Sequence, residues 1–496
     1  MARLLFGYDV GSSSVKASLI DADSGKLLAS ATSPAKELDI IAKQIGWAEQ
    51  EPQTWWKHVK IATQQIREQV KFEPGDVKAI GISYQMHGLV VVDKNQQVLR
   101  PSIIWCDSRA VPFGEKAMIK IGEEICLKSL FNLPGNFTIT KLLWVKENEP
   151  DIYSKIDKIM LPGDYIAMKM TGDVKTTPSG LSEGIIWDFE KEQLADFVLD
   201  SFDVSSELIA DRVPTFSNQG ELTSEAAQEL GLKAGTKVSY RAGDQPNNAL
   251  SLSVLEPGEV AVTAGTSGVV YGVSDQKNYD KLSRVNVFLH VNHTAENPRY
   301  GVLLCVSGTG ILNSWLKHNF VKEGMDYPQM NELAAEAPVG SDGLVILPYG
   351  NGAERTLENK NIGASVHGWN FNTHKKAHFL RAAQEGIVFA LNYGLGIMEN
   401  IGIKLKTVKA GHANMFLSPL FAEAFATITG ASVELYKTDG SQGAARGAGI
   451  GAGIYKGPED AFVGLEPVKT IEPNDKLTAQ YKKAYENWET VLKQNL

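Results

Sequence analysis

Cysteine is scarce in this chain. Of the 496 residues, three are cysteines, Cys106, Cys126 and Cys305, and they lie far apart in the sequence. An odd and scattered set fits neither a disulfide framework nor the paired spacing of a zinc site. We therefore expect free thiols in a reducing compartment.

Long apolar runs and excess positive charge are also missing. No segment approaches the roughly 20 uncharged apolar residues of a membrane span, and Met1 to Phe6 lead directly to Asp9 without the pattern of a signal peptide. The chain has 49 Lys and Arg against 58 Asp and Glu, a formal net charge of −9, which disfavours nucleic acid or an acidic membrane as the main partner. We expect a cytoplasmic protein.

The remaining composition is that of an ordinary globular protein. Hydrophobic residues make up 43% and charged residues 22%, so the chain can bury large cores and is not expected to be disordered. At roughly 150 residues per domain, this length predicts two to four domains.

Strand-type segments dominate the start of the chain. Leu4 to Val10 and Val15 to Ile20 flank a Gly/Ser turn, and Lys26 to Thr32 follows a second turn. A helical pattern extends from about Pro52 to Val70, and β-type residues return at Val77 to Ser83. This alternation predicts an α/β fold.

Later segments continue the alternation. The Gly/Ser/Pro-rich run Thr176 to Gly184 is typical of a loop. The other expected elements are a strand at Leu89 to Val92, helices at Thr140 to Glu147 and Gly163 to Thr171, a strand at Lys237 to Gly243, a long helix at Lys376 to Gly402, a Gly-rich region at Gly440 to Gly453 and a charged terminal helix at about Pro473 to Gln494.

A second β-rich block repeats the order of the first. Glu259 to Ala264, the turn Gly265-Thr266-Ser267-Gly268 and Val269 to Val273 again place a strand, a small-residue turn and a strand in sequence, which indicates two similarly built halves. Leu255-Glu256-Pro257-Gly258 is a plausible hinge. We therefore predict two domains, residues 1–254 and 255–496, the second ending in the terminal helix.

The first turn has the features of a phosphate-binding loop. Asp9 ends a strand, and Gly11, Ser12 and Ser13 supply backbone and hydroxyl donors, with Lys16 close behind. Such a turn can wrap phosphate oxygens while the carboxylate holds hydrated Mg²⁺. A plain hairpin turn is the alternative.

Two further loops could approach a nucleotide. They are Gly265-Thr266-Ser267-Gly268 and Ala410-Gly411-His412-Ala413-Asn414. The chain lacks the Gly-x-x-x-x-Gly-Lys-Ser/Thr motif and a convincing Gly-x-Gly-x-x-Gly after a strand, which disfavours a P-loop or dinucleotide domain. Phosphates would then have to be held by two separate turns.

Asp244 follows a predicted strand and precedes a predicted helix start. It could be an ordinary helix cap, or a general base that accepts a hydroxyl proton during phosphoryl transfer. His87, between Met86 and Gly88 after another strand, suits a pocket wall that binds a polyol or is a structural imidazole. Trp105 and Asp107 are either core and surface residues or parts of a sugar site, where a ring stacks and a carboxylate accepts hydroxyls.

Taken together, these motifs resemble the FGGY family of carbohydrate kinases, and most closely its members that phosphorylate D-xylulose. The resemblance covers nearly the whole chain. It is carried in order by Asp9 to Lys16, Gly46-Trp47-Ala48-Glu49-Gln50, Trp55-Trp56, Gln85-Met86-His87-Gly88, Leu99 to Arg109, Lys141 to Val145, Leu161 to Tyr165, Gly243-Asp244, Gly265 to Gly268 and Glu354-Arg355-Thr356.

The resemblance implies an α/β fold of two actin-like or hexokinase-like domains, each with a ribonuclease-H-type core, flanking a deep cleft for a sugar and MgATP. It also implies a possible homodimer. The implied roles are catalytic base for Asp244, an essential acid beside Mg²⁺ for Asp9, sugar contacts for Met86 and His87 with Trp105 and Asp107 as further candidates, phosphate contacts for Gly265 and Thr266, and nucleotide contacts for Gly411 and Asn414.

We therefore predict an ATP- and Mg²⁺-dependent kinase that converts D-xylulose to D-xylulose 5-phosphate. Within the family, ribulose, L-xylulose, gluconate or glycerol are alternative acceptors. Outside it, the same fold type also hosts noncatalytic actin-like ATP-binding regulators. A regulator would be expected to carry a basic DNA-reading helix pair, whereas this sequence begins directly with the phosphate-type strand.

Overall fold

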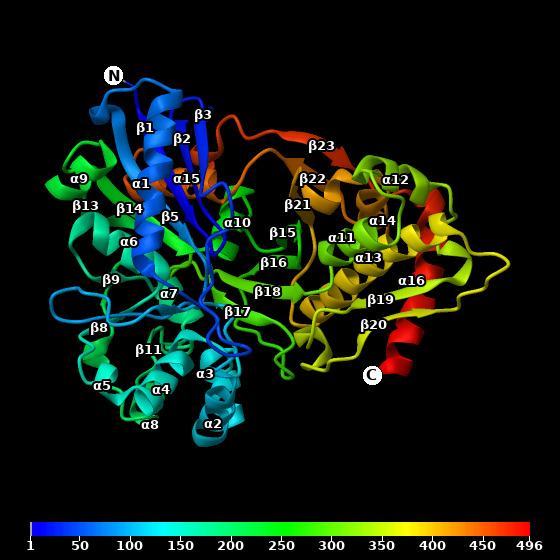
Figure 1. Cartoon of the computed structure of the whole chain (residues 1–496), viewed down its shortest axis with the longest axis horizontal. Coiled ribbons are helices and arrows are strands. Elements are labelled where there is room, and N and C mark those ends of the chain that lie inside the picture. Colours follow the sequence, from blue (N-terminus) through cyan, green and yellow to red (C-terminus); the bar gives the residue numbers. More distant parts are fainter. Residues whose placement is uncertain (1) are drawn as a thin grey trace. The chain divides into compact units, whose positions relative to one another are not determined.

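The computed structural model describes residues 2–496, and it alternates helices and strands in two compact units (Figure 1). Unit 1 comprises Met1–Ser253, Phe288–Arg299 and Thr438–Leu465, and unit 2 comprises Val254–Val287, Tyr300–Lys437 and Glu466–Leu496. The expected α/β class is confirmed. The sequence suggested a single boundary between residues 254 and 255, whereas the units are discontinuous because two later segments pack with unit 1.

The main sheet of unit 1 has six strands, and the first three strands of the chain form one side of it. The strand order is β13 (Phe216–Glu221), β14 (Lys237–Gly243), β5 (Val77–Tyr84), β1 (Leu4–Val10), β2 (Val15–Asp21) and β3 (Leu27–Ser33). β1 pairs in parallel with β5 and β5 with β14, while the β1–β2, β2–β3 and β13–β14 pairs are antiparallel.

Helix α1 (Pro52–Gln69) covers the face of this sheet on which Phe6 and Tyr8 lie. Proline at the start of the helix suits its first turn, where the missing N–H costs no hydrogen bond. Trp55 and Val59 recur at helical spacing and are fully buried in the same hydrophobic core as the two strand residues. The amphipathic pattern read from the sequence is therefore confirmed.

Helix α15 (Gly440–Gly451) covers the opposite face, where its orange ribbon crosses the blue strands in Figure 1. Gly7 and Gly81 meet this helix: a Cβ at either position would collide with the carbonyl oxygen of Ser441 or Ala444. Side chains alternate between faces along a strand, so Asp9, two residues after Gly7, belongs to the α15 face. The Gly-rich region is thus a close-packed helix.

The sheet of unit 2 repeats the topology of unit 1. The order is β18 (Tyr300–Val306), β16 (Gly268–Ser274), β15 (Glu259–Ala264), β21 (Thr407–Gly411), β22 (Val433–Tyr436) and β23 (Pro467–Ile471), and β17 (Asn286–Leu289) spans the boundary of the units. β15 and β16 form the hairpin, β18 pairs antiparallel with β16, and β21 and β22 extend the sheet in parallel before the antiparallel edge strand β23. This confirms the expectation of two similarly built halves.

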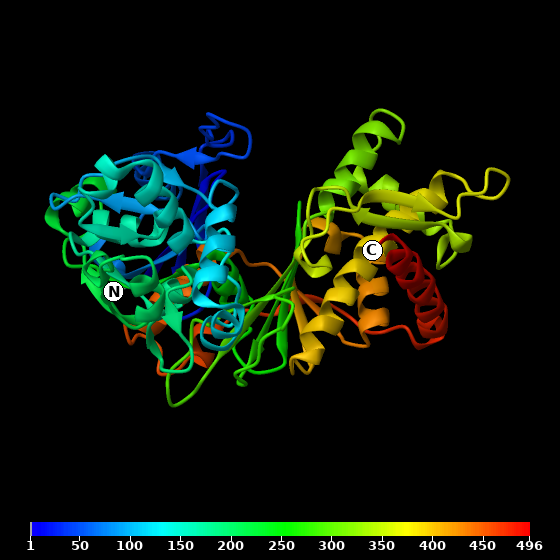
Figure 2. The same cartoon turned by 90° about the horizontal axis from the view of Figure 1, so that it is seen from below.

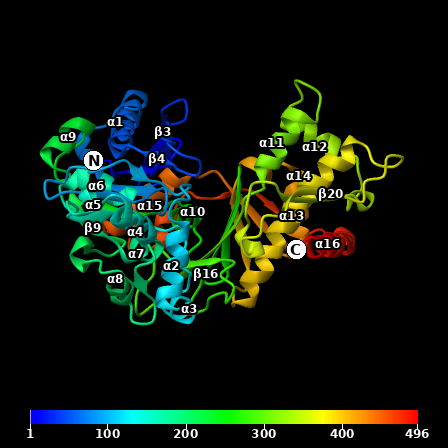
Figure 3. The same ribbon diagram turned by 60° about the horizontal axis from the view of Figure 1, so that its bottom comes forward.

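Long helices pack together in unit 2. α13 (Lys376–Asn400) contacts α14 (Pro419–Thr429), as Figure 3 shows, and the terminal α16 (Asp475–Asn495), red in Figure 2, packs against both. Both helices expected in this half, at Lys376 to Gly402 and Pro473 to Gln494, are confirmed. The remaining elements of unit 2 are α11 (Gly310–Asn319), α12 (Tyr327–Ala335) and the hairpin of β19 (Val345–Tyr349) and β20 (Gly363–His367).

Smaller helices and strand pairs complete unit 1. The expected loop at Thr176 to Gly184 is wrong, because Pro178–Glu183 forms helix α7, capped where Thr177 Oγ1 accepts a hydrogen bond from the Gly180 amide at 3.1 Å. The others are α2 (Val111–Ile121), α3 (Glu123–Leu130), α4 (Thr138–Asn148), α5 (Pro150–Tyr153), α6 (Pro162–Thr171), α8 (Asp196–Ser201), α9 (Ser224–Leu230) and α10 (Asp244–Ser251), with the strand pairs β4 (Glu49–Gln50) and β7 (Ser102–Ile103), β6 (Val90–Val92) and β8 (Lys158–Met160), β9 (Lys175–Thr176) and β12 (Asp211–Arg212), and β10 (Trp187–Asp188) and β11 (Gln193–Leu194).

All three cysteines are free thiols, as expected. Within residues 2–496, no helix combines the length and the apolar character that crossing a bilayer requires.

Candidate active site

Asp244 is the first residue of α10, directly after β14 ends at Gly243. Its side chain does not cap the helix; its Oδ2 accepts a hydrogen bond from Gln245 Nε2 at 3.1 Å. Burial raises the pKa of Asp244 to about 7, and the neighbouring negative charge of Asp9 adds to the rise. A carboxyl group with this pKa can accept and release a proton near neutral pH, as a general base must.

Asp9 lies near the end of β1, on the face covered by α15. Ser83 Oγ donates to its Oδ1 at 2.9 Å, and a Cβ on Gly440, the first residue of α15, would lie 2.6 Å from its Oδ2. Burial raises the pKa of Asp9, Asp439 contributes to the rise, and Lys16 and Ser83 oppose it. The carboxyl group therefore lies at the N-terminus of a twelve-residue helix, where backbone N–H groups favour negative charge.

These acids fit a magnesium ion that is bound mainly through phosphates. Asp439 Oδ1 accepts hydrogen bonds from the Gln442 amide at 3.0 Å and from Ser441 Oγ at 2.7 Å, so Asp439 is oriented beside Asp9. Across the described part of the chain, no group of three or more His, Cys, Asp or Glu side chains forms a metal cage. Magnesium with one or two carboxylates, waters and phosphate oxygens requires no such cage.

The turn after β1 begins two residues beyond Asp9. Gly11 N–H donates to Ser14 O at 3.0 Å, Gln50 Nε2 holds Ser12 O at 2.7 Å, and Trp105 Nε1 donates to Ser12 Oγ at 3.2 Å. Ser13 and Lys16 are exposed. The structure thus brings the predicted phosphate turn and the predicted sugar-site tryptophan together, and Trp105, 51% exposed, leaves much of its ring accessible.

The turn that carries Met86 and His87 also lies beside Asp244. A Cβ on Gly243 would collide with Met86 Cγ, so the methionine side chain packs against the end of β14. His87 has a φ of 63°, in the left-handed region that non-glycine residues rarely adopt. Its ring makes contacts with Phe137 and Phe288 at centroid distances of 5.0 and 5.5 Å. The strained backbone is thus fixed by packing, a frequent property of functional sites.

Asp107 is fully buried and engaged with the protein itself. Its Oδ2 accepts hydrogen bonds from the Ala48 amide at 2.5 Å and from Arg109 Nη2 at 2.6 Å, and its Oδ1 accepts one from the Arg109 amide at 2.9 Å. The Arg109 guanidinium stacks 3.7 Å from the centroid of Trp47. These contacts favour a structural role, in which Asp107 orients the loop that carries Trp105.

Two buried groups that sequence reasoning missed lie in the same region. Lys141 Nζ donates to His87 O at 2.6 Å, and burial lowers the pKa of Lys141 to about 7. Glu183, the last residue of α7, accepts a hydrogen bond from the His87 amide at 3.3 Å through Oε1. Lys141 stood within a motif of the family resemblance, whereas Glu183 fell in a segment expected to be a loop, so only the tertiary structure identifies it.

Unit 2 contains a pocket of about 850 Å³ that starts at its own hairpin turn. This volume is of the order expected for a small-molecule site. Gly310 N–H donates to Gly265 O at 2.8 Å and Ile311 N–H to Thr266 O at 3.1 Å, so the turn is tied to the start of α11. The lining residues are Ala264, Gly265, Thr266, Gly310, Ile311, Asn313, Ser314, Tyr327, Pro328, Asn331, Glu332, Ala335, Asn414, Met415, Leu417, Ser418, Pro419 and Leu420.

The structure brings three of the four nucleotide candidates of this half together. Gly265, Thr266 and Asn414 line the pocket, and a Cβ on Gly265 would lie 3.5 Å from Asn414 Nδ2. Gly411 ends β21 and is not among the lining residues. The apolar residues Ile311, Leu417 and Leu420 offer a surface suited to a flat base.

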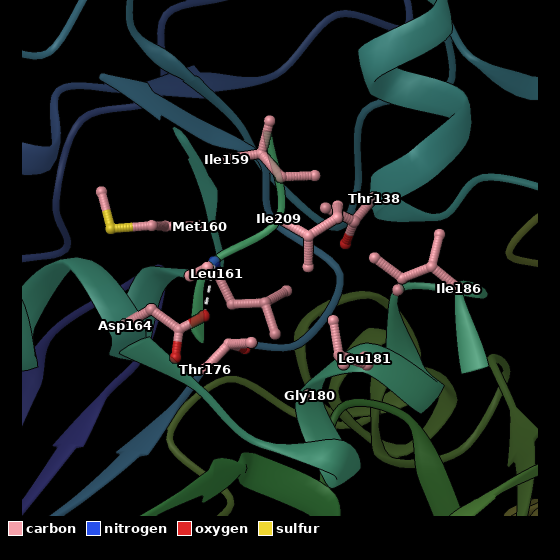
Figure 4. A pocket seen from close by; sticks show the side chains of 12 residues that line it. Thr138, Ile159, Met160, Leu161, Asp164, Thr176, Gly180, Leu181, Ile186 and Ile209 are labelled. Atoms are coloured by element: carbon pink, nitrogen blue, oxygen red, sulfur yellow. Dashed lines mark hydrogen bonds between the residues drawn. The ribbon is translucent and has the colours of Figure 1, made fainter. Parts of the chain in front are cut away.

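A smaller cavity in unit 1 does not fit a substrate. Figure 4 shows Ile159, Ile186 and Ile209 around it, with Asp164 accepting a hydrogen bond from the Leu161 amide at 3.1 Å. Its volume is about 20 Å³, enough for about one water molecule. We interpret it as a packing defect behind the site.

Family models match both halves of the chain. The N-terminal domain of the FGGY family of carbohydrate kinases matches residues 4–251, and the C-terminal domain of the same family matches residues 260–454. The xylulose kinase of Bacillus subtilis (strain 168) is 27% identical over 499 residues, which cover 99% of this chain and 96% of that protein.

Solved structures share the fold over the whole chain. The xylulose kinase from Rhodospirillum rubrum superimposes with a TM-score of 0.89 at 24% identity and covers 99% of both chains. The gluconate kinase from Lactobacillus acidophilus has a TM-score of 0.89 at 22% identity, covering 100% of this chain and 98% of that one. The two-domain actin-like architecture expected from the sequence is thus confirmed, and the chain belongs to the FGGY family of carbohydrate kinases.

Proposed function

We propose that this enzyme transfers the γ-phosphoryl group of ATP to the C5 hydroxyl of D-xylulose, forming D-xylulose 5-phosphate and ADP. The observation that carries the proposal is Asp244, a carboxyl group with a pKa of about 7 at the end of β14, beside Asp9 and the turn of Met86 and His87. The full-length xylulose kinase relatives at 27–29% identity support the choice of sugar.

In this proposal Asp244 is the general base. Its carboxylate accepts the C5 hydroxyl proton as the hydroxyl oxygen forms a bond to the γ-phosphorus, and the bond between that phosphorus and the β–γ bridging oxygen breaks as ADP leaves. Because the proton has to leave only as the new bond forms, a base with a pKa near the working pH is well matched to the step.

In this proposal, two turns of the chain would hold the phosphates. In unit 1 they would meet the Gly11, Ser12 and Ser13 turn, with Lys16 nearby, and in unit 2 the Gly265 and Thr266 turn at the mouth of the nucleotide pocket. Backbone and hydroxyl donors fixed beforehand stabilise oxygens whose charge changes during the reaction. Asn414 and the apolar pocket wall would bind the nucleoside part, while Gly411 lies at the end of β21 and does not line the pocket.

Asp9, with Asp439 beside it, would hold magnesium together with the phosphate oxygens. When bound, the ion supplies positive charge against the phosphates. The acids are oriented by Ser83 and by the first turn of α15, so both carboxylates are placed before the ligand arrives.

The sugar would lie against Met86, His87 and the accessible ring of Trp105. An indole stacks on the apolar face of a sugar, and polar groups around it orient the hydroxyls. Asp107 would act through this loop, since its carboxylate is already hydrogen-bonded to Arg109 and Ala48.

A coupled assay of ADP release over ketoses, polyols and sugar acids tests the proposal. We expect the highest kcat/KM with D-xylulose, and lower values with ribulose, L-xylulose, gluconate and glycerol. A higher kcat/KM for any of these would overturn the assignment of the sugar while leaving the kinase activity of the family intact.

A further inference from the structure

Glu183 is a buried acid that the proposed reaction does not use. It ends helix α7, which packs against β14, and its side chain is 1% exposed. A carboxyl group at this depth is costly unless its oxygens find partners. The partners of its two oxygens therefore decide what it does.

One oxygen of Glu183 is used within the protein. Oε1 accepts a hydrogen bond from the backbone amide of His87 at 3.3 Å, and the backbone carbonyl of Glu183 lies 3.0 Å from His87 Nδ1. The end of α7 is therefore tied to the turn that carries Met86 and His87. This arrangement holds Glu183 in one orientation relative to the sugar-site turn.

The other oxygen, Oε2, has no hydrogen-bond partner among residues 2–496. It lies against Gly243, because a Cβ at that position would collide with both Glu183 Oε2 and Met86 Cγ. Gly243 directly precedes Asp244, so Oε2 lies near both Met86, a proposed sugar contact, and the backbone that carries the proposed base. It is a buried polar atom without a partner within the protein, close to the end of β14 that carries the proposed base.

Burial and nearby charges shift the pKa of the Glu183 carboxyl group. Burial raises the pKa of Glu183 well above its usual value, and the negative charges of Asp244 and Asp164 add to this effect, while the His87 amide and Lys141 oppose it. Compared with an exposed glutamate, the carboxyl group is therefore shifted toward its neutral form. Because Oε1 already accepts from the His87 amide, Oε2 is the oxygen left to form a hydrogen bond with an oxygen atom of a ligand.

We propose that Glu183 is a substrate-binding residue that determines specificity, with Oε2 forming a hydrogen bond to one oxygen of the acceptor sugar. This inference rests on the proposed function only in placing the acceptor beside Asp244. A site that hydrogen-bonds a substrate oxygen discriminates strongly against an analogue that lacks it, because the buried group is then left unpaired.

Two substitutions separate the hydrogen bond from the shape of the side chain. Glu183→Gln keeps an acceptor for the His87 amide and a donor in place of Oε2, so we expect kcat/KM for the preferred sugar to stay within about threefold. Glu183→Met keeps the approximate bulk without polar atoms and should lower kcat/KM by about 10- to 100-fold. Ser182→Ala is the matched control, because Ser182 Oγ donates to the Ser179 carbonyl within α7 and accepts from the Leu289 amide of β17. We expect this variant to change kcat/KM by less than about threefold.

The decisive measurement pairs these variants with analogues of the preferred acceptor. In the analogue set, each oxygen other than the phosphate acceptor is replaced in turn by hydrogen. With the native enzyme, one analogue should have a kcat/KM at least about tenfold lower than that of the intact sugar. With Glu183→Met, the same analogue and the intact sugar should have nearly equal kcat/KM values. The proposal would be overturned if the effects of Glu183→Met and of removing a sugar oxygen were additive for every oxygen. A kcat/KM of Glu183→Met equal to that of the native enzyme would also overturn it.

The failure of this inference is distinguishable from failure of the proposed function. If the assay gives the highest kcat/KM with a sugar other than D-xylulose, the sugar assignment fails. The comparison of native and variant enzymes is then repeated with that sugar and its analogues. If sugar phosphorylation is normal in Glu183→Met, the inference alone fails. Melting curves monitor folding, and Glu183→Ala takes the place of Glu183→Met in the comparison if that variant does not fold.

Discussion

At the residue scale, burial and hydrogen-bond partners distinguish acidic side chains that are chemically alike. Asp9, Asp107, Glu183 and Asp244 are all acids of one unit, yet their surroundings differ. Asp107 is saturated by Arg109 and Ala48, Glu183 is fixed through one oxygen, and Asp244 has a pKa near neutrality. Only the last arrangement suits a base that must be ionised and still able to take up a proton.

This difference predicts the pH dependence of the reaction. A base works when it is ionised, so kcat/KM should fall about tenfold per pH unit below about 7 and level off above it. Lys141 also has a pKa of about 7, but loss of its positive charge would lower activity as the pH rises, the opposite direction. A pH profile of initial rates in ADP release checks the sign. A flat profile between pH 5.5 and roughly 8 would contradict an ionising base with this pKa.

Sequence reasoning could identify Asp244 and Asp9 because each ends a recognisable strand beside a turn. It could not show that Asp107 accepts a hydrogen bond from the Ala48 amide, or that Glu183 lies against Gly243, since both contacts join residues distant in sequence. The helix that carries Glu183 was missed because Pro178, Ser179 and Gly180 favour loops. Thr177 and Pro178 are nevertheless ordinary helix-start residues, and that signal was available.

At the element scale, the Gly-rich segment forms helix α15 because its small residues allow close packing on the sheet. Its glycines and alanines allow the backbone to approach β1 and β5, which themselves present Gly7 and Gly81 at the contact. This close approach brings the first turn of α15 to Asp9. The strand positions could be predicted from alternation and β-branched residues, but the return of residues 438–465 to unit 1 has no local signal.

A single methyl group at this contact should therefore destabilise the protein. Gly81→Ala places a Cβ into the Ala444 carbonyl and should lower the free energy of unfolding by about 1–3 kcal/mol. Gly457→Ala is the control, since a Cβ there meets no atom within 4 Å, and its effect should stay within about 0.5 kcal/mol. Thermal and urea unfolding measure both. Equal stability of the two variants would show that α15 does not pack tightly on the sheet.

At the scale of the whole molecule, the proposed reaction requires the sugar of unit 1 and the nucleotide of unit 2 to meet while water is excluded. The chain crosses between the units five times, and the expected hinge near Gly258 is anchored in unit 2, where its N–H donates to Val273 O at 3.0 Å and its carbonyl accepts from Lys406 N–H at 2.9 Å. The predicted hinge at Gly258 therefore lies inside unit 2 and not at a crossing between the units.

Solution scattering tests this closure. Profiles are compared for the free protein, for each ligand alone, and for D-xylulose together with magnesium and a non-hydrolysable ATP analogue. We expect the smallest radius of gyration with both ligands, because only then are both units engaged. Identical profiles in all four states would count against ligand-induced closure.

The central claim is that Asp244 removes the proton of the accepting hydroxyl, and the most direct test is turnover by Asp244→Asn. This substitution keeps the size and the hydrogen-bonding capacity of the side chain while removing the base. If Asp244 is the base, this variant should have a kcat lower by about 100- to 10,000-fold, with folding and the affinities for sugar and nucleotide retained. A kcat close to that of the native enzyme would contradict it.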